Sequence, residues 1–557
     1  MRKRSPWLKW LACGGIMAVV AAVRGQASGP AADLPRIVER NGRHALLVEG
    51  QPFFMFSGQT NNSNAWPGML PEVWRAVATI HANTVEMPVY WEQIEPQQGK
   101  FDFSVVDTLL QEARDHKVRL VLLWFATWKN GSAHYLPEWM KLEAGVKYPN
   151  IKGRNGRPVD SPSPHTQAAM ALDAQAFTAF MGHLKQADPR HTVLMVQVEN
   201  ESGAWGSVRD YSAAAQKIFE GPVPAEMLKP ELLKELKKTA PTAAGANWQT
   251  VFGDDADEFF QAYAVAHYVG QVAAAGKAAY PLPLYANAAL RDPISNPKAG
   301  GYESGGPTDN VIPIWRMAAP ALDLVAPDIY LSDSPRQLKV LDLYDRPDNP
   351  LMVPEIGSGV EFGRMLFAVL AHGAIGFCTG PLDDNGGGEP PERTAARLAP
   401  FSANYALLGP MMRELARWSF EGKLKAAIEL DDHAAQTLDL GAWQANVSFG
   451  GGDRGGGGAR GAGRGAATTP ARPAVGQLLV AQLGPNELMC VGSAAKSTFR
   501  PIGPNSGKEW HYLRVEEGNY VDGTFKALRI WNGDETDGGG PNFPANPVAL
   551  HITLYTR

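Results

Sequence analysis

The chain has 557 residues, of which 45% are hydrophobic and 20% charged, and its formal net charge is −5. This length exceeds what a single hydrophobic core normally serves, so we expect two or more domains. No long basic run follows the first ten residues, which argues against a nucleic-acid partner.

The N-terminus has the layout of a secretory signal. The positive residues Arg2, Lys3 and Arg4 precede an apolar run over residues 10–23, and small residues follow up to Ala27. This order is typical of a signal peptide, which we place at residues 1–27. The apolar run is short for a membrane span, and an uncleaved anchor is the alternative. We therefore expect a periplasmic or secreted protein without stable membrane insertion after cleavage.

Beyond that segment the chain has two cysteines, Cys378 and Cys490, which lie far apart in the sequence. Two buried free thiols fit this spacing better than a disulfide. The histidines show no paired spacing of the HxH or HExxH kind. We therefore expect no metal site and no cofactor.

Residues 35–418 show apolar runs of strand length that alternate with segments of helical periodicity. The expected strands span residues 52–59, 83–89, 119–125, 192–201, 283–287, 322–329, 351–354 and 374–379. The expected helices span residues 71–81, 103–116, 165–186, 228–238, 258–275 and 395–418. Long inserts follow the third strand, at residues 131–164, and the fourth, at residues 202–256. Eight strands in this alternation predict a (β/α)8 barrel with long loops.

From about residue 419 the pattern changes to short alternating runs. They span residues 423–430, 478–483, 491–499 and 548–555. Such runs predict a small all-β domain over residues 419–557. Within it, residues 450–473 hold glycine runs and repeated Arg-Gly, a composition that predicts a flexible loop.

The fourth expected strand changes abruptly from apolar to polar at its end. Apolar residues run directly into Glu199, Asn200 and Glu201. Unpaired carboxylates avoid apolar surroundings, so these groups need a partner or a use. Barrels of this kind carry their chemistry at the carboxyl ends of the strands. The alternative is a strand that simply runs out into a solvated loop.

Polar or aromatic residues end the other expected strands as well, and a closed barrel would gather them on one rim. They are Gln59, Tyr90, Trp91, Trp128, Asn200, Glu201, Asn287, Tyr330 and Glu355.

Glu201 and Glu355 end or directly follow strands four and seven, which lie on opposite sides of an eight-stranded barrel. Their carboxylates can therefore face each other across the rim. A glycosidase needs two such groups, one to protonate the leaving oxygen and one to attack the anomeric carbon or activate water. A separation of about 5–5.5 Å predicts a retaining reaction. Alternatively, either glutamate pairs with an arginine in a solvated loop.

At these residues the sequence resembles glycoside hydrolase family 35, the β-galactosidases. The family's Q-[IV]-E-N-E signature is matched by Gln197-Val198-Glu199-Asn200-Glu201. Residues 91–103 resemble its W-N-x-H-E-P-x-x-G-x-F-x-F segment. The resemblance covers roughly residues 35–415, and the Asn-Glu pair with a later Glu is the broader mark of clan A glycosidases.

The resemblance implies a role for several strand-end residues. Glu201 would be the acid/base, Glu355 the nucleophile, Asn200 the partner of the sugar 2-hydroxyl, and Tyr330 a hydrogen-bond donor to the nucleophile. We expect the remaining substrate contacts from Gln59, Tyr90, Trp128 and Asn287. The indoles that offer a stacking face, or else belong to the core, are Trp66, Trp91, Trp128 and Trp205.

Three positions depart from the family pattern. Pro88 stands where a tyrosine is common, Glu92 replaces an asparagine, and Thr127 replaces a sugar-binding glutamate. These departures bear on galactose specificity rather than on the retaining mechanism. The tail, with its segments at residues 515–520 and 532–536, looks like the accessory β-domain of a bacterial subgroup that includes enzymes acting on xyloglucan fragments.

Glu199 has two interpretations. Strand alternation places it on the same face as Glu201. There it would raise the proton affinity of Glu201 by like-charge repulsion, or pair with a barrel arginine or lysine.

Together these patterns predict a retaining exo-β-galactosidase that acts on terminal β-D-galactosyl residues of plant-derived oligo- or polysaccharides. One rival is the same mechanism on another β-linked sugar, such as glucose, fucose or arabinose. The other is a carbohydrate-binding protein without catalysis. A carbohydrate is the expected partner in each case, and the sequence predicts no oligomeric state.

Overall fold

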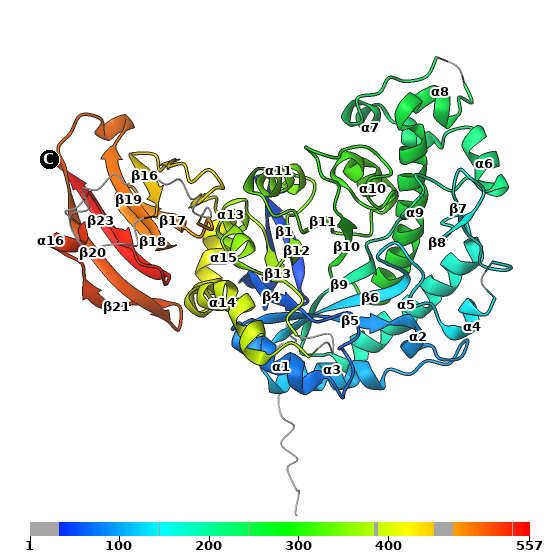
Figure 1. Cartoon of the computed structure of the whole chain (residues 1–557), viewed down its shortest axis with the longest axis horizontal. Helices are drawn as coiled ribbons and strands as arrows, with labels where there is room; N and C mark the ends of the chain where they lie inside the picture. The colour runs from blue at the N-terminus through cyan, green and yellow to red at the C-terminus, as the bar shows by residue number, and fades with distance from the viewer. Residues whose placement is uncertain (1–32, 144, 243, 384–387, 451–471, 537–538) are drawn as a thin grey trace, which may run out of the picture.

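The computed structural model describes residues 33–143, 145–242, 244–383, 388–450, 472–536 and 539–557. The expected signal peptide at residues 1–27 and most of the expected loop at residues 450–473 lie outside the described residues. Figure 1 shows two parts side by side, a barrel surrounded by helices and a smaller part built of strands.

Eight parallel strands form a closed barrel, as the sequence predicts. In chain order they are β4 (Met55–Gln59), β5 (Thr84–Tyr90), β6 (Arg119–Lys129), β9 (Val193–Asn200), β10 (Leu284–Ala289), β11 (Leu324–Ile329), β12 (Val353–Ile356) and β13 (Gly376–Thr379). Each pairs in parallel with the next, and β13 pairs with β4 to close the ring. Every residue of β9 is buried, since both faces of the strand are covered. Burial on both faces explains the continuous apolar run in its sequence.

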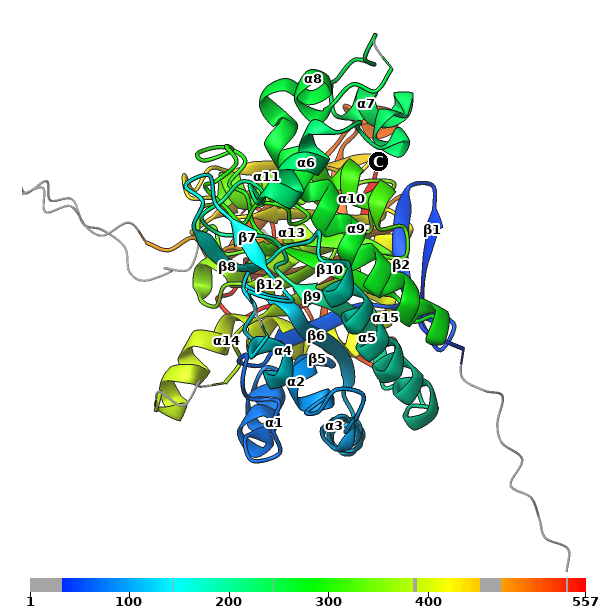
Figure 2. The same ribbon diagram turned by 90° about the vertical axis from the view of Figure 1, so that its right-hand side faces the viewer.

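The helices pack outside these strands, and Figure 2 shows α3, α5 and α9 around β6 and β9. The expected helices correspond to α1 (Leu70–Thr79), α3 (Ser104–Asp115), α5 (Gln167–Ala187), α7 (Pro230–Glu235) and α9 (Ala256–Ala279). Further helices are α2 (Trp91–Ile94), α6 (Ala213–Glu220), α8 (Trp248–Phe252), α10 (Ile312–Ala318), α11 (Ser334–Tyr344), α12 (Val360–Gly363) and α13 (Met365–Ala371). In α1 the buried residues Leu70, Val73 and Val77 recur at helical spacing and face the barrel.

Three expectations about local structure are wrong. The single helix expected at residues 395–418 is two helices, α14 (Pro391–Leu408) and α15 (Met412–Phe420). A short 3-10 turn at Gly409–Met411 separates them, and its Pro410 lacks the N–H that a continuing α-helix requires. The insert at residues 131–164 is not wholly irregular, since it contains α4 (Glu138–Lys141) and a hairpin of β7 (Asn150–Lys152) and β8 (Pro158–Pro162).

The third concerns the strand expected at residues 491–499. It is two strands, β18 (Glu487–Ser493) and β19 (Ala495–Pro501), which belong to different sheets. Between them Ala494 has a φ of 46°, in the left-handed region, and this turns the chain from one sheet to the other.

In its described residues the C-terminal part consists mainly of β-strands, as expected, with the short α16 (Gly533–Thr536) and a 3-10 turn at Gly503–Asn505. A six-stranded sheet has the order β14 (Leu424–Ile428), β17 (Gln477–Gly484), β18, β23 (Val548–Thr556), β20 (Trp510–Val521) and β21 (Thr524–Ile530). A four-stranded sheet has the order β15 (Gln436–Asp439), β16 (Trp443–Phe449), β19 and β22 (Asn542–Phe543). The two sheets enclose an apolar core that includes Trp443, Phe499 and Cys490.

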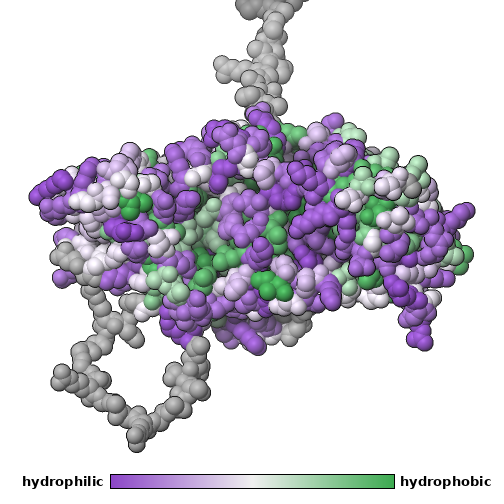
Figure 3. All heavy atoms as spheres, turned by 90° about the horizontal axis from the view of Figure 1, so that it is seen from above, coloured by the Kyte–Doolittle hydropathy of each residue, from purple (hydrophilic) through white to green (hydrophobic). Residues whose placement is uncertain are grey.

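An N-terminal antiparallel sheet of β1 (Arg36–Arg40), β2 (Arg43–Val48) and β3 (Gln51–Phe53) was not predicted. The C-terminal part is tied to the barrel helices by hydrogen bonds. Arg364 Nε donates to the Glu429 carbonyl at 2.8 Å, and the Ser334 backbone N–H donates to Asp431 at 2.8 Å. The face of the molecule in Figure 3 is mostly hydrophilic, with hydrophobic residues in small groups.

Cys378 and Cys490 are both buried and free, which confirms that expectation. Among the described residues, no helix has the length and apolar character needed to cross a membrane.

Candidate active site

A cavity of about 240 Å³ lies at the carboxyl ends of the barrel strands. It is lined by Gln59, Thr60, Asn61, Asn62, Lys129, Asn130, Glu201, Tyr330, Glu355, Gly380 and Pro381. Most of these side chains are polar, and they come from loops or strand ends far apart in the sequence.

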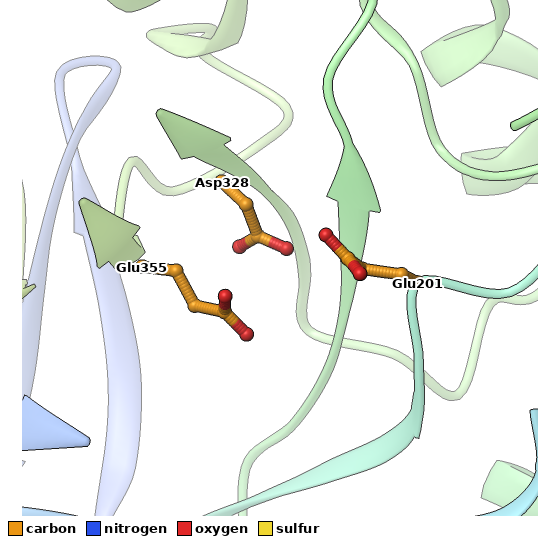
Figure 4. A group of neighbouring side chains, drawn as sticks. All are labelled: Glu201, Asp328 and Glu355. Atoms are coloured by element: carbon orange, nitrogen blue, oxygen red, sulfur yellow. The ribbon is translucent and has the colours of Figure 1, made fainter. Parts of the chain in front are cut away.

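Three carboxyl groups meet at this cavity. Glu201 follows β9 directly, Asp328 is next to last in β11, and Glu355 is next to last in β12. One oxygen of each lies within 4.8 Å of the others, and Figure 4 shows the three carboxyl groups pointing toward one another. The structure thus brings one oxygen of Glu201 and one of Glu355 within 4.8 Å, below the ~6.5 Å at which the carboxyl separations of inverting pairs begin. This close approach favours the retaining arrangement.

Four donors hold Glu355. Its Oε1 accepts hydrogen bonds from Gln59 Nε2 at 3.2 Å, Asn200 Nδ2 at 3.3 Å and Asn287 Nδ2 at 3.5 Å. Its Oε2 accepts one from the Tyr330 hydroxyl at 2.8 Å. An ionised carboxylate only accepts hydrogen bonds, so this set suits it and fixes its orientation.

Glu201 has a different environment. Burial, followed by the charge of Glu355, raises the pKa of Glu201 to about 7, although Lys129 and Asp328 act in the opposite direction. Its backbone N–H donates to Asn287 Oδ1 at 2.9 Å, and its carbonyl accepts from the Gly131 N–H at 2.8 Å. Because its pKa lies near neutrality, Glu201 can both give and take a proton, whereas Glu355 is held as an acceptor.

The backbone that presents Glu201 is strained. Glu199 has a φ of 64° and Glu201 a φ of 46°, conformations that non-glycine residues rarely adopt. Strain of this kind persists where surrounding contacts fix it, and it clusters at functional sites.

This strain also makes the expectation for Glu199 wrong. The left-handed residue breaks the strand alternation, so Glu199 does not share the face of Glu201. Its Oε2 accepts from the Trp128 backbone N–H at 2.7 Å, and it lies beside the buried carboxyl of Asp173 on α5. Burial and Asp173 raise the pKa of Glu199 well above its ordinary value, so the pair shares protons instead of forming an ion pair.

Of the expected substrate-binding residues, Gln59 and Tyr330 line the cavity, while Asn200 and Asn287 are buried behind it against Glu355. The structure does not place Tyr90 and Trp128 at the cavity. The Tyr90 hydroxyl donates to the Asn62 carbonyl at 2.7 Å, and the Trp128 indole N–H donates to Ser161 at 3.0 Å. Both side chains are buried because their strands turn them toward packed loops.

Exposure separates the four candidate stacking indoles. Trp91 and Trp128 are fully buried, whereas Trp66 is 46% and Trp205 50% exposed. Trp66 lies in the loop after β4 and stacks on Tyr90 with ring centroids 6.2 Å apart. Trp66 and Trp205 therefore remain candidates for sugar contacts.

The sequence did not single out two charged residues of this site, Lys129 and Asp328. Lys129 is buried, lines the cavity and lowers the pKa of Glu201. Asp328 is fully buried and accepts a hydrogen bond from Asn287 Nδ2 at 2.6 Å. An acidic residue near the end of an apolar strand is the signal that singled out Glu201, and it is present at Asp328 too.

The three positions that depart from the family pattern, Pro88, Glu92 and Thr127, are not among the residues that line the cavity. The Thr127 hydroxyl donates to Asp173 at 2.6 Å, under α5. Glu92 forms an ion pair with Lys141 at 2.7 Å.

The three carboxyl groups also have the spacing of a possible cation site, which histidine spacing did not predict. Three amide N–H groups already face Oε1 of Glu355. Those donors suit a hydrogen-bond acceptor better than a metal ligand.

Comparison with known families agrees with this geometry. Residues 62–261 match the glycoside hydrolase family 42 model, described as "Beta-galactosidase". Residues 401–540 match a domain of unknown function. The sequence is 28% identical over 181 residues to a β-galactosidase of Xanthomonas manihotis. This aligned segment covers 31% of this chain and 28% of that protein. It is 27% identical over 109 residues to β-galactosidase 11 of Arabidopsis thaliana, covering 18% of this chain and 12% of that protein.

The chain thus spans less than a third of the length of these curated relatives. Solved structures with similar barrels include the β-amylase catalytic domain of Paenibacillus polymyxa, with a TM-score of 0.47, 14% identity, and coverage of 62% of this chain and 96% of that one. Another is a β-galactosidase of Bacillus circulans sp. alkalophilus, with a TM-score of 0.45, 16% identity, and coverage of 65% of this chain and 57% of that one. The sequence matches support a clan A glycoside hydrolase of the β-galactosidase type.

Proposed function

We propose that this protein is a retaining exo-β-galactosidase that removes terminal β-D-galactosyl residues from plant-derived oligo- or polysaccharides. The observation that carries the proposal is the approach of the Glu201 and Glu355 carboxyl oxygens to within 4.8 Å in a polar cavity. The matched β-galactosidase segment and the Q-V-E-N-E motif favour the galactoside over other sugars.

In the first step Glu355 attacks the anomeric carbon and the glycosidic bond breaks. Glu201 gives its proton to the departing oxygen, so the leaving sugar departs as a neutral alcohol. Four donors fix the orientation of the Glu355 carboxylate, which lines the cavity. The product of this step is a covalent sugar ester of Glu355.

In the second step Glu201, now a carboxylate, takes a proton from water. The water oxygen attacks the anomeric carbon and releases Glu355. Two displacements at one carbon restore the original configuration. The pKa of about 7 at Glu201 suits both roles, because neither protonation state is strongly disfavoured near neutral pH.

The size of the cavity supports cleavage at chain ends. A volume of about 240 Å³ accommodates one sugar ring with its hydroxyl groups. The inserts after β6 and β9 lie beside the mouth of the cavity, since Asn130 and Glu201 line the cavity where these inserts begin.

The motifs of the sequence favour family 35 as the family of this enzyme. The signal-like pattern of its N-terminus favours a location outside the cytoplasm, in the periplasm or secreted.

A panel of nitrophenyl β-glycosides tests this function. We expect rapid cleavage of the galactoside and much slower cleavage of the glucoside, fucoside and arabinoside. Proton NMR of the first sugar released should show the β-anomer. Preference for another sugar would overturn the galactoside assignment, and release of the α-anomer would overturn the retaining mechanism.

A further inference from the structure

Asp328 is the third carboxyl group at the catalytic pair, and the two steps above give it no role. It is fully buried, and one of its oxygens lies within 4.8 Å of oxygens of Glu201 and Glu355. In Figure 4 its carboxyl group points toward both glutamates.

The two oxygens of Asp328 have unequal surroundings. Oδ2 accepts a hydrogen bond from Asn287 Nδ2 at 2.6 Å. Oδ1 is buried and has no hydrogen-bond partner among the described residues. Burying an ionised oxygen without a donor costs free energy. A protonated Oδ1 needs only a hydrogen-bond acceptor, and the neighbouring carboxyl groups provide one.

The surrounding charges also favour a neutral Asp328. Two carboxyl groups face Asp328, those of Glu355 on β12 and Glu201 after β9. Glu303, in the loop after β10, lies near Glu201. The positive charge of Lys129, at the end of β6, acts in the opposite direction on Asp328. Burial first, and then the charges of Glu355 and Glu201, raise the pKa of Asp328 well above its ordinary value.

We propose that Asp328 is a positioning residue that keeps its proton throughout the reaction and donates a hydrogen bond from Oδ1 to the carboxyl group of Glu201. This inference rests on the proposed function for its catalytic meaning. When Glu201 has given its proton to the leaving oxygen, the new carboxylate finds a donor already in place. When Glu201 takes a proton from water, the Asp328 proton stays on Asp328. The hydrogen bond therefore makes Glu201 a stronger acid and holds it toward the cavity.

Infrared spectroscopy of the free protein tests the protonation directly. The difference spectrum between the unchanged protein and Asp328→Asn at neutral pH should show the C=O band of one protonated carboxylic acid. Other buried acids are present in both proteins, so their bands cancel in the difference spectrum. A carboxylate band in its place would overturn the proposal, and this measurement needs no substrate.

The pH profile tests the effect on Glu201. Removing the donor in Asp328→Ala should move the alkaline limb of kcat/KM upward by about one pH unit. It should also lower kcat by roughly tenfold, with little change in KM. Asp328→Asn should restore the limb and most of the rate, because the amide N–H2 donates where the acid O–H did and its oxygen still accepts from Asn287.

Asp173→Asn is the matched control. Asp173 is also a fully buried aspartate, but Trp124 and Thr127 hold it away from the cavity, so its replacement should leave the alkaline limb unmoved.

An unshifted alkaline limb in Asp328→Ala would overturn the positioning role and leave Asp328 with a structural role. If Asp328→Ala does not fold, the Asp328→Asn spectrum alone decides the protonation. If the unchanged protein cleaves no glycoside, the proposed function fails, whereas the spectrum still decides the state of Asp328.

Discussion

A carboxyl oxygen of Glu201 lies within 4.8 Å of a carboxyl oxygen of Glu355, although strands β10 and β11 separate their two strands in the barrel. The two groups are not equivalent. Glu355 accepts hydrogen bonds from four side chains, while burial and the charge of Glu355 raise the pKa of Glu201 to about 7. We propose Glu355 as the nucleophile and Glu201 as the proton carrier, and each assignment can be tested.

Glu355→Gln removes the nucleophile with little change in shape. We expect kcat on nitrophenyl β-galactoside to fall on the order of 10⁴-fold or more. Binding of a galactose-derived inhibitor, measured by calorimetry, should change by no more than about threefold, because the amide keeps the size of the side chain. Residual activity within about tenfold of the unchanged enzyme would contradict the assignment.

Tyr330→Phe removes the donor to Oε2 of Glu355 without emptying space. A hydrogen bond to a charged group contributes about 1.5–3 kcal/mol, so kcat should fall roughly 10- to 100-fold. Steady-state kinetics checks this, with Tyr135→Phe as control, because the Tyr135 hydroxyl donates to the Asn62 carbonyl at 3.5 Å rather than to Glu355. Equal effects in both variants would remove the special role of Tyr330.

The pH dependence of kcat/KM should show an alkaline limb near pH 7. The first step needs protonated Glu201, and the pKa of that group is raised to about 7 by burial and by Glu355. Activity should therefore fall as the pH rises through this value, since Glu201 then loses the proton it must donate. A limb absent up to about pH 9, or placed near the ordinary glutamate value, would contradict the acid role of Glu201.

Glu86 should make stability depend on pH. It is fully buried in the barrel, and burial raises its pKa from 4.5 to about 8. Between these values the folded protein holds a proton that the unfolded chain releases, so the free energy of unfolding falls as the pH rises. Glu86→Gln removes this contribution, and the drop in Tm between about pH 6 and about pH 8.5 should shrink by a few degrees. An unchanged drop would show that Glu86 is not the group responsible.

Trp66→Ala tests the aromatic face beside the cavity. The ring is 46% exposed and stacked on Tyr90, in the loop that also carries the cavity residues Asn61 and Asn62. Aromatic packing contributes about 0.5–1.5 kcal/mol, so KM for a galactosyl oligosaccharide should rise roughly 2- to 10-fold. Inhibition by free galactose should not change. An equal loss for galactose would place Trp66 at the cleaved sugar rather than at the leaving group.

The local pattern of apolar and polar residues was enough to predict the barrel strands and the polar strand ends that carry the candidate site residues. The run that ends in Glu199, Asn200 and Glu201 is apolar because parallel barrel strands are covered on both faces, and its polar end marks the rim. Helix boundaries were less predictable. The break at Gly409 and Pro410 is a turn signal that the periodicity of the flanking helices concealed.

Alternation failed at Glu199 because it assumes extended backbone at every residue. The φ values of 64° at Glu199 and 46° at Glu201 turn neighbouring carboxylates to different sides. Tyr90 and Trp128 were predicted from their place at strand ends, yet their hydroxyl and indole groups bond to loop atoms instead. Asp328 carried the same sequence signal as Glu201, but without a matching family motif it did not stand out.

The sequence by itself determined the alternation of strands and helices, and with it the rim on which Glu201 and Glu355 must both lie. Hydrophobic periodicity is a property of each segment, so it survives without knowledge of the neighbours. Only the tertiary structure decided which groups face the cavity, that Asp328 joins the pair, and that the pKa of Glu201 is raised. Burial and the distance between charges set these properties, and both arise only when strands far apart in the chain close into one barrel.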